Sequence, residues 1–139
     1  MAKIVSFINI KGGVGKTTLV ANTADALHRF GKRVLMVDLD MQSNLTDIAT
    51  ADLDAIKHTA YELFMDEDLM ATQICVPSII EDCDIITSDL RLITVEPQIT
   101  AERKPNAYTL LSEKLDSVCR ETYDYILIDT PPLIFASEL

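Results

Sequence analysis

Apolar residues in the first forty positions follow two different spacings. Residues 4–10 form an almost continuous apolar run, which predicts a strand buried on both faces of a parallel sheet. Between 19 and 30 the apolar positions recur at helical spacing, and Gly31 follows where a left-handed helix cap is expected. Residues 34–37 are a second apolar run. A strand, a helix and a strand with short connections predict a right-handed crossover unit.

The rest of the chain repeats these elements more weakly. Thr59 and Glu62 have the spacing of a capping box, which predicts the start of a short helix. Residues 84–87 predict a third strand, 107–119 one amphipathic helix after Pro105, and 125–129 a further buried strand. Residues 49–57 have no clear pattern. We therefore expect an α/β fold, a mostly parallel sheet flanked by helices, with residues 1–139 in a single domain.

Composition is compatible with such a domain. Hydrophobic residues make up 48% of the 139 positions, which is enough for a buried core. No apolar run approaches the roughly 18 residues that a membrane-spanning helix needs, and the first residues do not have the layout of a signal peptide. We therefore expect a cytoplasmic protein without membrane contact. The spacing of Cys75, Cys83 and Cys119 indicates reduced, mostly buried thiols and no zinc or disulfide framework.

The net charge of −10 is concentrated in one segment. Residues 47–89 contain eleven acidic side chains and one basic side chain, Lys57, whereas the remaining positions hold eleven of each. An acidic chain lacks the broad basic field that attracts DNA or anionic lipid, so neither contact is expected of this portion. The segment is either a solvated face or mobile insertion, or a docking surface for a basic partner.

A glycine-rich stretch, Lys-Gly-Gly-Val-Gly-Lys-Thr-Thr, connects the first predicted strand to the first helix. Backbone N–H groups of such a loop and the helix dipole favour phosphate, Lys16 can reach the β- and γ-phosphates, and the Thr17 hydroxyl can bind Mg²⁺. Ile10 stands where the generic P-loop pattern has glycine. The predicted nucleotide-binding residues are Gly12, Gly13, Val14, Gly15, Lys16, Thr17 and Thr18.

Three aspartates end strands at the edge of the sheet where ligands bind in α/β folds. Asp38 and Asp40 follow the second strand, and Asp129 ends the run 125–129 before two prolines. Asp129 matches a Walker B aspartate, which holds Mg²⁺ directly or through water. An aspartate in such a place also commonly caps a turn. Asp38 has either a direct role or the simpler role of shaping the turn.

Two segments resemble the ParA/MinD superfamily of ATPases. The stretch from Lys11 to Thr18 is similar to its deviant Walker A motif, in which the early lysine, here Lys11, reaches the nucleotide of a dimer partner. Residues 38–46 resemble the first switch of the ParA branch, with Met41 in place of the usual proline. The resemblance implies that Asp40 positions the attacking water and helps order Mg²⁺. Lys11, Lys16 and Asp40 are then the catalytic residues, and Thr17, Asp40 and Asp129 the metal site.

The resemblance covers nearly the whole chain and implies Mg-ATP binding, ATP hydrolysis, nucleotide-dependent homodimerisation and a ParB-like stimulating partner in plasmid or chromosome partitioning. Family members continue past the Walker B strand, so we expect a P-loop fold truncated there, without the family's DNA-binding half and with an unpaired apolar edge on the first strand. Two alternatives are a non-enzymatic nucleotide-binding fragment and a membrane-linked or biosynthetic ATPase of the same superfamily.

Overall fold

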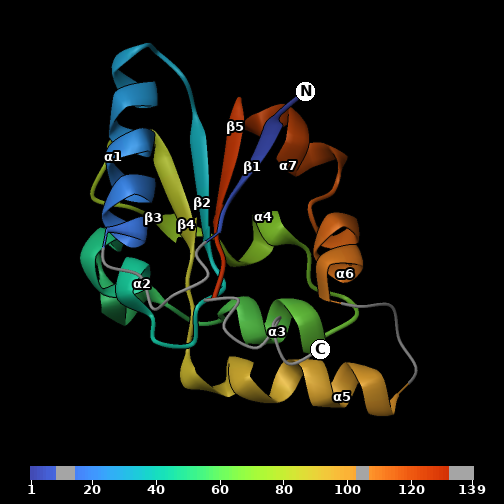
Figure 1. Cartoon of the computed structure of the whole chain (residues 1–139). Coiled ribbons are helices and arrows are strands. Elements are labelled where there is room, and N and C mark those ends of the chain that lie inside the picture. The colour runs from blue at the N-terminus through green and yellow to red at the C-terminus, as the bar shows by residue number, and fades with distance from the viewer. Residues whose placement is uncertain (9–14, 103–106, 132–139) are drawn as a thin grey trace.

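A five-stranded sheet with helices on both faces forms the centre of the computed structural model, which describes residues 1–8, 15–102 and 107–131 (Figure 1). The strand order is β1-β5-β2-β4-β3. The strands are β1 (Lys3–Phe7), β2 (Val34–Asp38), β3 (Val76–Pro77), β4 (Cys83–Ile86) and β5 (Tyr125–Asp129). All neighbouring strands pair in parallel except β3, which is antiparallel to β4. The predicted α/β fold with a mostly parallel sheet is confirmed.

Helices of one to four turns cover the sheet. Their bounds are α1 (Lys16–Arg29), α2 (Asn44–Ala49), α3 (Ala60–Met65), α4 (Ala71–Ile74), α5 (Val95–Ala101), α6 (Ala107–Lys114) and α7 (Ser117–Thr122), with 3₁₀ turns at Leu53–Ala55 and Leu90–Thr94. Helices α1 and α2 lie on one side of the sheet, and α3, α6 and α7 lie on the other (Figure 1). Within the described ranges, no helix is both long enough and apolar enough to cross a bilayer.

The core is divided by the sheet into two clusters. Val34 and Met36 of β2 pack with α1 on one face, while Leu35 and Val37 pack with the α3 and α6 helices on the other. This alternation follows from the two-residue repeat of a strand. Because both faces are covered, every residue of β2 is buried, as the continuous apolar run predicts.

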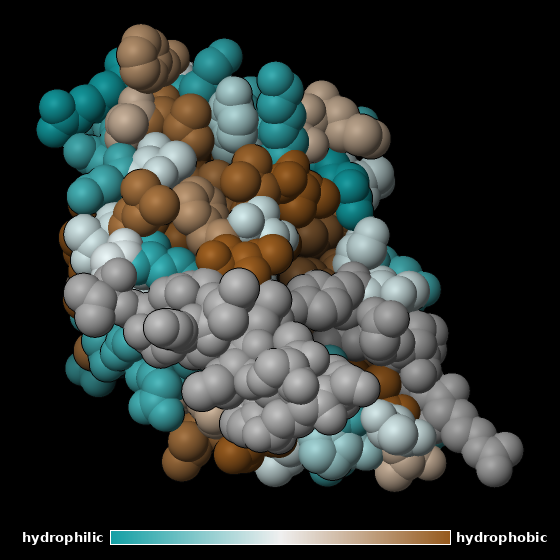
Figure 2. All heavy atoms as spheres, viewed as in Figure 1, coloured by the Kyte–Doolittle hydropathy of each residue, from teal (hydrophilic) through white to brown (hydrophobic). Residues whose placement is uncertain are grey.

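Strand β1 differs from the prediction that it is buried on both faces. It lies at the edge of the sheet and pairs with β5, and Ile4 and Val5 remain 40% and 41% exposed. Hydrophobic residues accordingly reach the surface in the middle of the face viewed in Figure 2, where β1 lies in Figure 1. Within the described part of the chain, the expected unpaired apolar edge is therefore present.

Helix α1 ends as the sequence predicts. Gly31 has a φ of 77°, its N–H donates to the carbonyl of His28, and the N–H of Lys32 donates to the carbonyl of Leu27. This pair of hydrogen bonds is a Schellman motif, for which glycine is favoured at the left-handed position. The apolar spacing included Leu19 and Phe30, but these side chains are 55% and 80% exposed.

The single helix predicted over 107–119 is in fact two helices. Helix α6 ends at Lys114, and the carboxylate of Asp116 accepts a hydrogen bond from the N–H of Cys119 at 2.9 Å, which caps α7. An aspartate offers the backbone this alternative to continuing a helix. Leu115 and Cys119 still face the same core cluster, so the apolar spacing continues across the break.

The middle of the chain confirms two weaker predictions. Thr59 and Glu62 form the predicted capping box at the start of α3, and β4 occupies the place of the predicted third strand. Residues 49–57, which had no clear pattern, contain the end of α2 and the 3₁₀ turn at Leu53–Ala55. Cys83 and Cys119 are buried and Cys75 is half-buried, and all three are free thiols.

Candidate functional site

The C-terminal end of β5 meets the first turn of α1. The Nζ atom of Lys16 lies 2.9 Å from one carboxylate oxygen of Asp129, and the Thr17 hydroxyl donates to the other oxygen at 3.0 Å. The Lys16 and Asp129 side chains are 7% and 0% exposed. Gly15, directly before the helix, has a φ of 95°, a left-handed conformation that glycine adopts without strain. Three residues predicted from distant motifs are thus in direct contact.

The chemistry of this cluster fits a phosphate and a hard divalent cation. Hydroxyl and carboxylate oxygens are the ligands that Mg²⁺ prefers, and Thr17 and Asp129 supply one of each. The Lys16 ammonium is a buried cation at the N-terminal end of a 14-residue helix, where the helix dipole also favours an anion. Lys16 and Asp129 neutralise one another here.

Asp38 lies beside Asp129 in the sheet register and is completely buried. Its carboxylate accepts hydrogen bonds from the N–H of Asp40 at 3.0 Å and from the N–H and hydroxyl of Thr46 at 2.9 and 2.8 Å. Burial raises the pKa of Asp38 to about 6, and the hydrogen bonds from Thr46 offset part of this effect. These contacts correspond to the turn-shaping role of the two that the sequence left open.

Asp40 is 6% exposed on the loop that follows β2. Its carboxylate accepts a hydrogen bond from the N–H of Gln42 at 3.0 Å, which is the turn-capping contact typical of aspartate. Its backbone carbonyl accepts from the N–H of Ser43 and from the Ser88 hydroxyl. Within the described residues no hydrogen bond joins the Asp40 carboxylate to the Lys16, Thr17 and Asp129 cluster.

Part of the predicted phosphate loop lies outside the described residues. Lys11, Gly12, Gly13 and Val14 belong to this part. Thr18 is described and lies exposed in the first turn of α1. The roles assigned to these five residues from the sequence therefore stay predictions.

Two buried hydroxyl residues at this site were not predicted from the sequence. The Thr46 hydroxyl contacts Asp38, and Ser88, just after β4, donates its hydroxyl proton to the Asp40 carbonyl at 2.6 Å. Thr46 is the last residue of the 38–46 segment that resembles the switch, but no contact was assigned to it there. For Ser88 the only sequence signal is its position after a strand of the same sheet as Asp38 and Asp129. Both residues belong to the loops at one end of the sheet.

The acid-rich segment 47–89 does not form one uniform face. It runs through α2, α3, α4, β3 and β4, and several of its acids have local partners. The Arg91 guanidinium lies 2.7 Å from the Glu62 carboxylate and 2.8 Å from that of Asp89, and its central carbon is 4.3 Å from the centroid of the Tyr61 ring. We call Tyr61, Glu62, Asp89 and Arg91 the Arg91 cluster. Through these contacts, Glu62 and Asp89 of the segment bind another part of the same chain.

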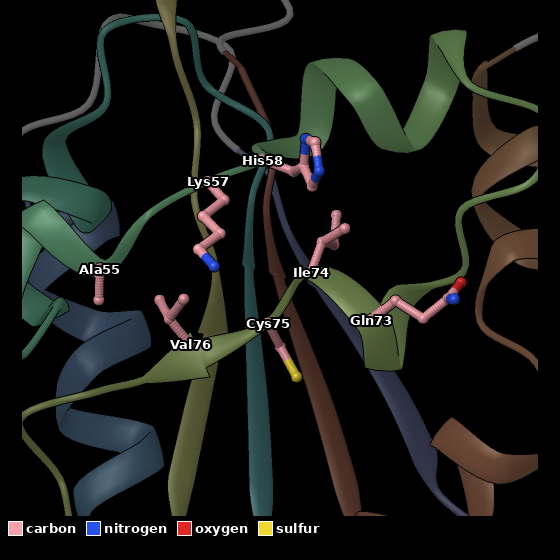
Figure 3. A pocket seen from close by; sticks show the side chains of 7 residues that line it. All are labelled: Ala55, Lys57, His58, Gln73, Ile74, Cys75 and Val76. Carbon is pink, nitrogen blue, oxygen red and sulfur yellow. The ribbon is translucent and has the colours of Figure 1, made fainter.

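A separate cavity of about 200 Å³ lies between the 55–58 segment and the α4–β3 connection (Figure 3). The lining residues are Ala55, Lys57, His58, Gln73, Ile74, Cys75 and Val76. The Lys57 side chain extends toward β3 in this view. None of the residues predicted to bind nucleotide or metal lines this cavity, so it is distinct from the cluster around Asp129.

Comparisons with known proteins extend over nearly the whole chain. Residues 2–136 match a protein family described as an AAA domain. The chain is 35% identical over 136 residues to the sporulation initiation inhibitor protein Soj of Bacillus subtilis, covering 95% of this chain and 51% of that protein. It is 32% identical over 133 residues to the chromosome partitioning protein ParA of Caulobacter vibrioides, with coverages of 94% and 48%.

A solved structure with a different name is also similar. The crystal structure of cobyrinic acid a,c-diamide synthase from Mycobacterium smegmatis with a bound ATP analogue and magnesium has a TM-score of 0.82 and 29% identity. The match covers 95% of this chain and 52% of that chain. The chain thus spans about half the length of the relatives that it matches.

Proposed function

We propose that this chain, which belongs to the AAA domain family matching residues 2–136 and resembles ParA-type partition ATPases, binds Mg-ATP at the cluster around Asp129. The observation that carries the proposal is the contact of Lys16 and Thr17 with the Asp129 carboxylate at 2.9 and 3.0 Å. A lysine, a hydroxyl and a strand-end aspartate at a helix N-terminus are the groups that a P-loop site requires.

Each residue of the cluster has a task in this proposal. Lys16 would bind phosphate oxygens in place of its ion pair with Asp129, and Thr17 and Asp129 would hold the magnesium ion. When bound there, the ion would neutralise phosphate charge and polarise the phosphoryl group. Asp40 positions the attacking water, and the loop from Gly12 to Thr18 contacts the phosphates.

The whole-protein role that we propose is plasmid or chromosome partitioning. ATP binding drives homodimerisation in which Lys11 reaches the partner's nucleotide, and a ParB-like protein stimulates turnover. The similarity to the chromosome partitioning protein ParA of Caulobacter vibrioides supports this role. We assign DNA binding to the half of such proteins that this chain does not cover, because this portion carries a net charge of −10.

A second candidate is a biosynthetic ATPase of the same superfamily. The TM-score of 0.82 to a diamide synthase favours it, since the nucleotide half of the two folds is so similar. The segment from Asp38 to Thr46 argues for the partition branch, because it resembles the first switch of that branch. A chain that binds nucleotide but does not hydrolyse it on its own is the third possibility.

The test is a Mg-ATP titration of the 139-residue chain with light scattering to follow mass. We expect saturable binding that is lost in Lys16→Ala and kept in Lys57→Ala, a matched control because Lys57 lines the separate cavity. Thr17→Ala, which removes one hydroxyl, serves if Lys16→Ala does not fold. Doubling of mass with ATP would support the dimer. Absence of binding by the folded wild-type chain would overturn the proposal.

A further inference from the structure

Ser88 occupies a buried position between two loops. It follows β4 by two residues and is 6% exposed. Its hydroxyl donates to the backbone carbonyl of Asp40 at 2.6 Å, and its N–H donates to the Thr46 hydroxyl at 2.8 Å. One residue therefore holds the loop after β2 at two places.

Thr46 extends this connection to the end of β2. Its hydroxyl accepts the hydrogen bond from Ser88 and donates its own proton to the Asp38 carboxylate at 2.8 Å. The hydroxyl of Thr46 and the carboxylate of Asp38 are both buried, so each of these bonds forms away from water. The hydrogen bonds between Asp38 and Thr46 thus join the two ends of the loop that carries Asp40.

Ser88 is itself firmly anchored by its two neighbours. The carbonyl of Thr87 accepts a hydrogen bond from the N–H of Ala60 at 2.7 Å, at the start of α3. The Asp89 carboxylate accepts from the Thr59 hydroxyl at 2.5 Å and from the Arg91 guanidinium at 2.8 Å. The segment around Ser88 is therefore fixed to α3, and the Asp40 loop is fixed to this segment.

We propose that Ser88 is a positioning residue for Asp40. Met41 has no ring to fix its φ as proline would, whereas the Ser88 hydroxyl, together with the N–H of Ser43, holds the Asp40 carbonyl and so the backbone from which the side chain extends. A group that must hold a water molecule for an in-line attack gains from such fixation. The catalytic meaning of this inference rests on the proposed function of Asp40, but the fixation itself does not.

The first test measures the fixation by hydrogen exchange on the chain without nucleotide. In Ser88→Ala the amides of Gln42, Ser43 and Thr46 should exchange about 3- to 10-fold faster, the loss expected for one buried hydrogen bond. Ser78→Ala is the matched control, because the hydroxyl of the 8% exposed Ser78 bonds to the backbone of Ile80 and not to the Asp40 loop. Unchanged exchange at these amides in folded Ser88→Ala would overturn the proposal.

The second test separates positioning from general stability. Ser88→Ala should release phosphate about 3- to 10-fold more slowly than wild type, with its Kd for Mg-ATP within about twofold. Faster exchange with an unchanged rate would overturn the positioning role. If Ser88→Ala does not fold, Ser88→Cys, whose S–H is a weaker donor to the Asp40 carbonyl, gives the same comparison. Failure of the wild type to bind Mg-ATP would count against the proposed function, while hydrogen exchange would still decide on Ser88.

Discussion

Two clusters of opposite charges in this molecule have almost the same contact distances but very different surroundings. Lys16 and Asp129 approach to 2.9 Å with side chains 7% and 0% exposed. Arg91 approaches Glu62 and Asp89 to 2.7 and 2.8 Å with its own side chain 52% exposed. Removing one charge of a buried pair leaves the other without water, whereas water replaces a partner at the surface. Burial, more than distance, decides what each pair does.

The pKa values of the carboxyl groups in the two regions are also shifted in opposite directions. Burial alone would raise the pKa values of Glu62 and Asp89, but hydrogen bonds from Thr59 and Arg91 outweigh it and lower both pKa values. At Asp38, next to the buried pair, burial outweighs the hydrogen bonds and raises the pKa to about 6. The surface region therefore favours ionised carboxylates, and the buried region opposes one of them.

The largest expected effect comes from removing one charge of the buried pair. Asp129→Ala should lower the free energy of unfolding by about 3–5 kcal/mol, because Lys16 is left buried without a counter-charge. Denaturation in urea, followed by far-UV circular dichroism, measures this loss.

A double variant provides the control for that prediction. Lys16→Met with Asp129→Leu removes both charges and should recover most of the lost stability, since no buried charge remains unpaired. If Asp129→Ala costs less than about 1 kcal/mol, the pair behaves like a surface pair and the comparison fails.

The next effect concerns the pH dependence of stability. The pKa of Asp38 is higher in the folded state, at about 6, than the ordinary value of 3.8. Its contribution is therefore fully present below about pH 4 and is lost as the pH rises through 6. Relative to Asp38→Asn, the wild-type free energy of unfolding should fall by up to about 3 kcal/mol between pH 4 and pH 7. A difference that stays constant with pH, or rises, would contradict this.

Lys114 extends the comparison to a buried cation whose partners are backbone carbonyls, whereas the partner of Lys16 is a carboxylate. Its Nζ donates to the carbonyls of Asp66, Glu67 and Leu69 at 2.6, 3.1 and 2.7 Å, and the residue is 7% exposed. Lys114→Met should lower the free energy of unfolding by about 1.5–3 kcal/mol, the range for hydrogen bonds to charged groups. Thermal and urea unfolding measure it, with the exposed Lys32→Met as the control that should change little.

The central strands and the charged cluster could be predicted from the sequence because their signals are local. Residues 34–37 are apolar throughout since both faces of β2 are covered, and the motif around Lys16 and Thr17 is continuous in the chain. The burial of β1 could not be predicted in this way. Exposure of Ile4 and Val5 depends on which strand lies beside β1, and that is a property of the whole sheet.

Ser88 and the helix break at Asp116 were not predicted, and in both cases the local sequence pattern does not reveal the contact that decides the structure. Ser88 contacts Asp40 across 48 residues of chain, and a serine contributes nothing to a hydrophobic pattern. The break at Asp116 was missed because Leu115 and Cys119 keep helical spacing across it, while a capping carboxylate outweighed the spacing. Local capping is visible in a sequence only where the flanking pattern does not conceal it.

The smallest effect is expected in the Arg91 cluster. Arg91→Ala should lower the free energy of unfolding by at most about 1 kcal/mol, because exposed ion pairs are weak and screened by water. The part due to Glu62 and Asp89 should shrink in 1 M NaCl, where the Debye length is about 3 Å, whereas the contact with the Tyr61 ring should persist. Urea unfolding of wild type and Arg91→Ala at low and high salt separates the two parts. A loss above about 3 kcal/mol would place this exposed cluster with the buried pair, and exposure would then fail to distinguish the two regions.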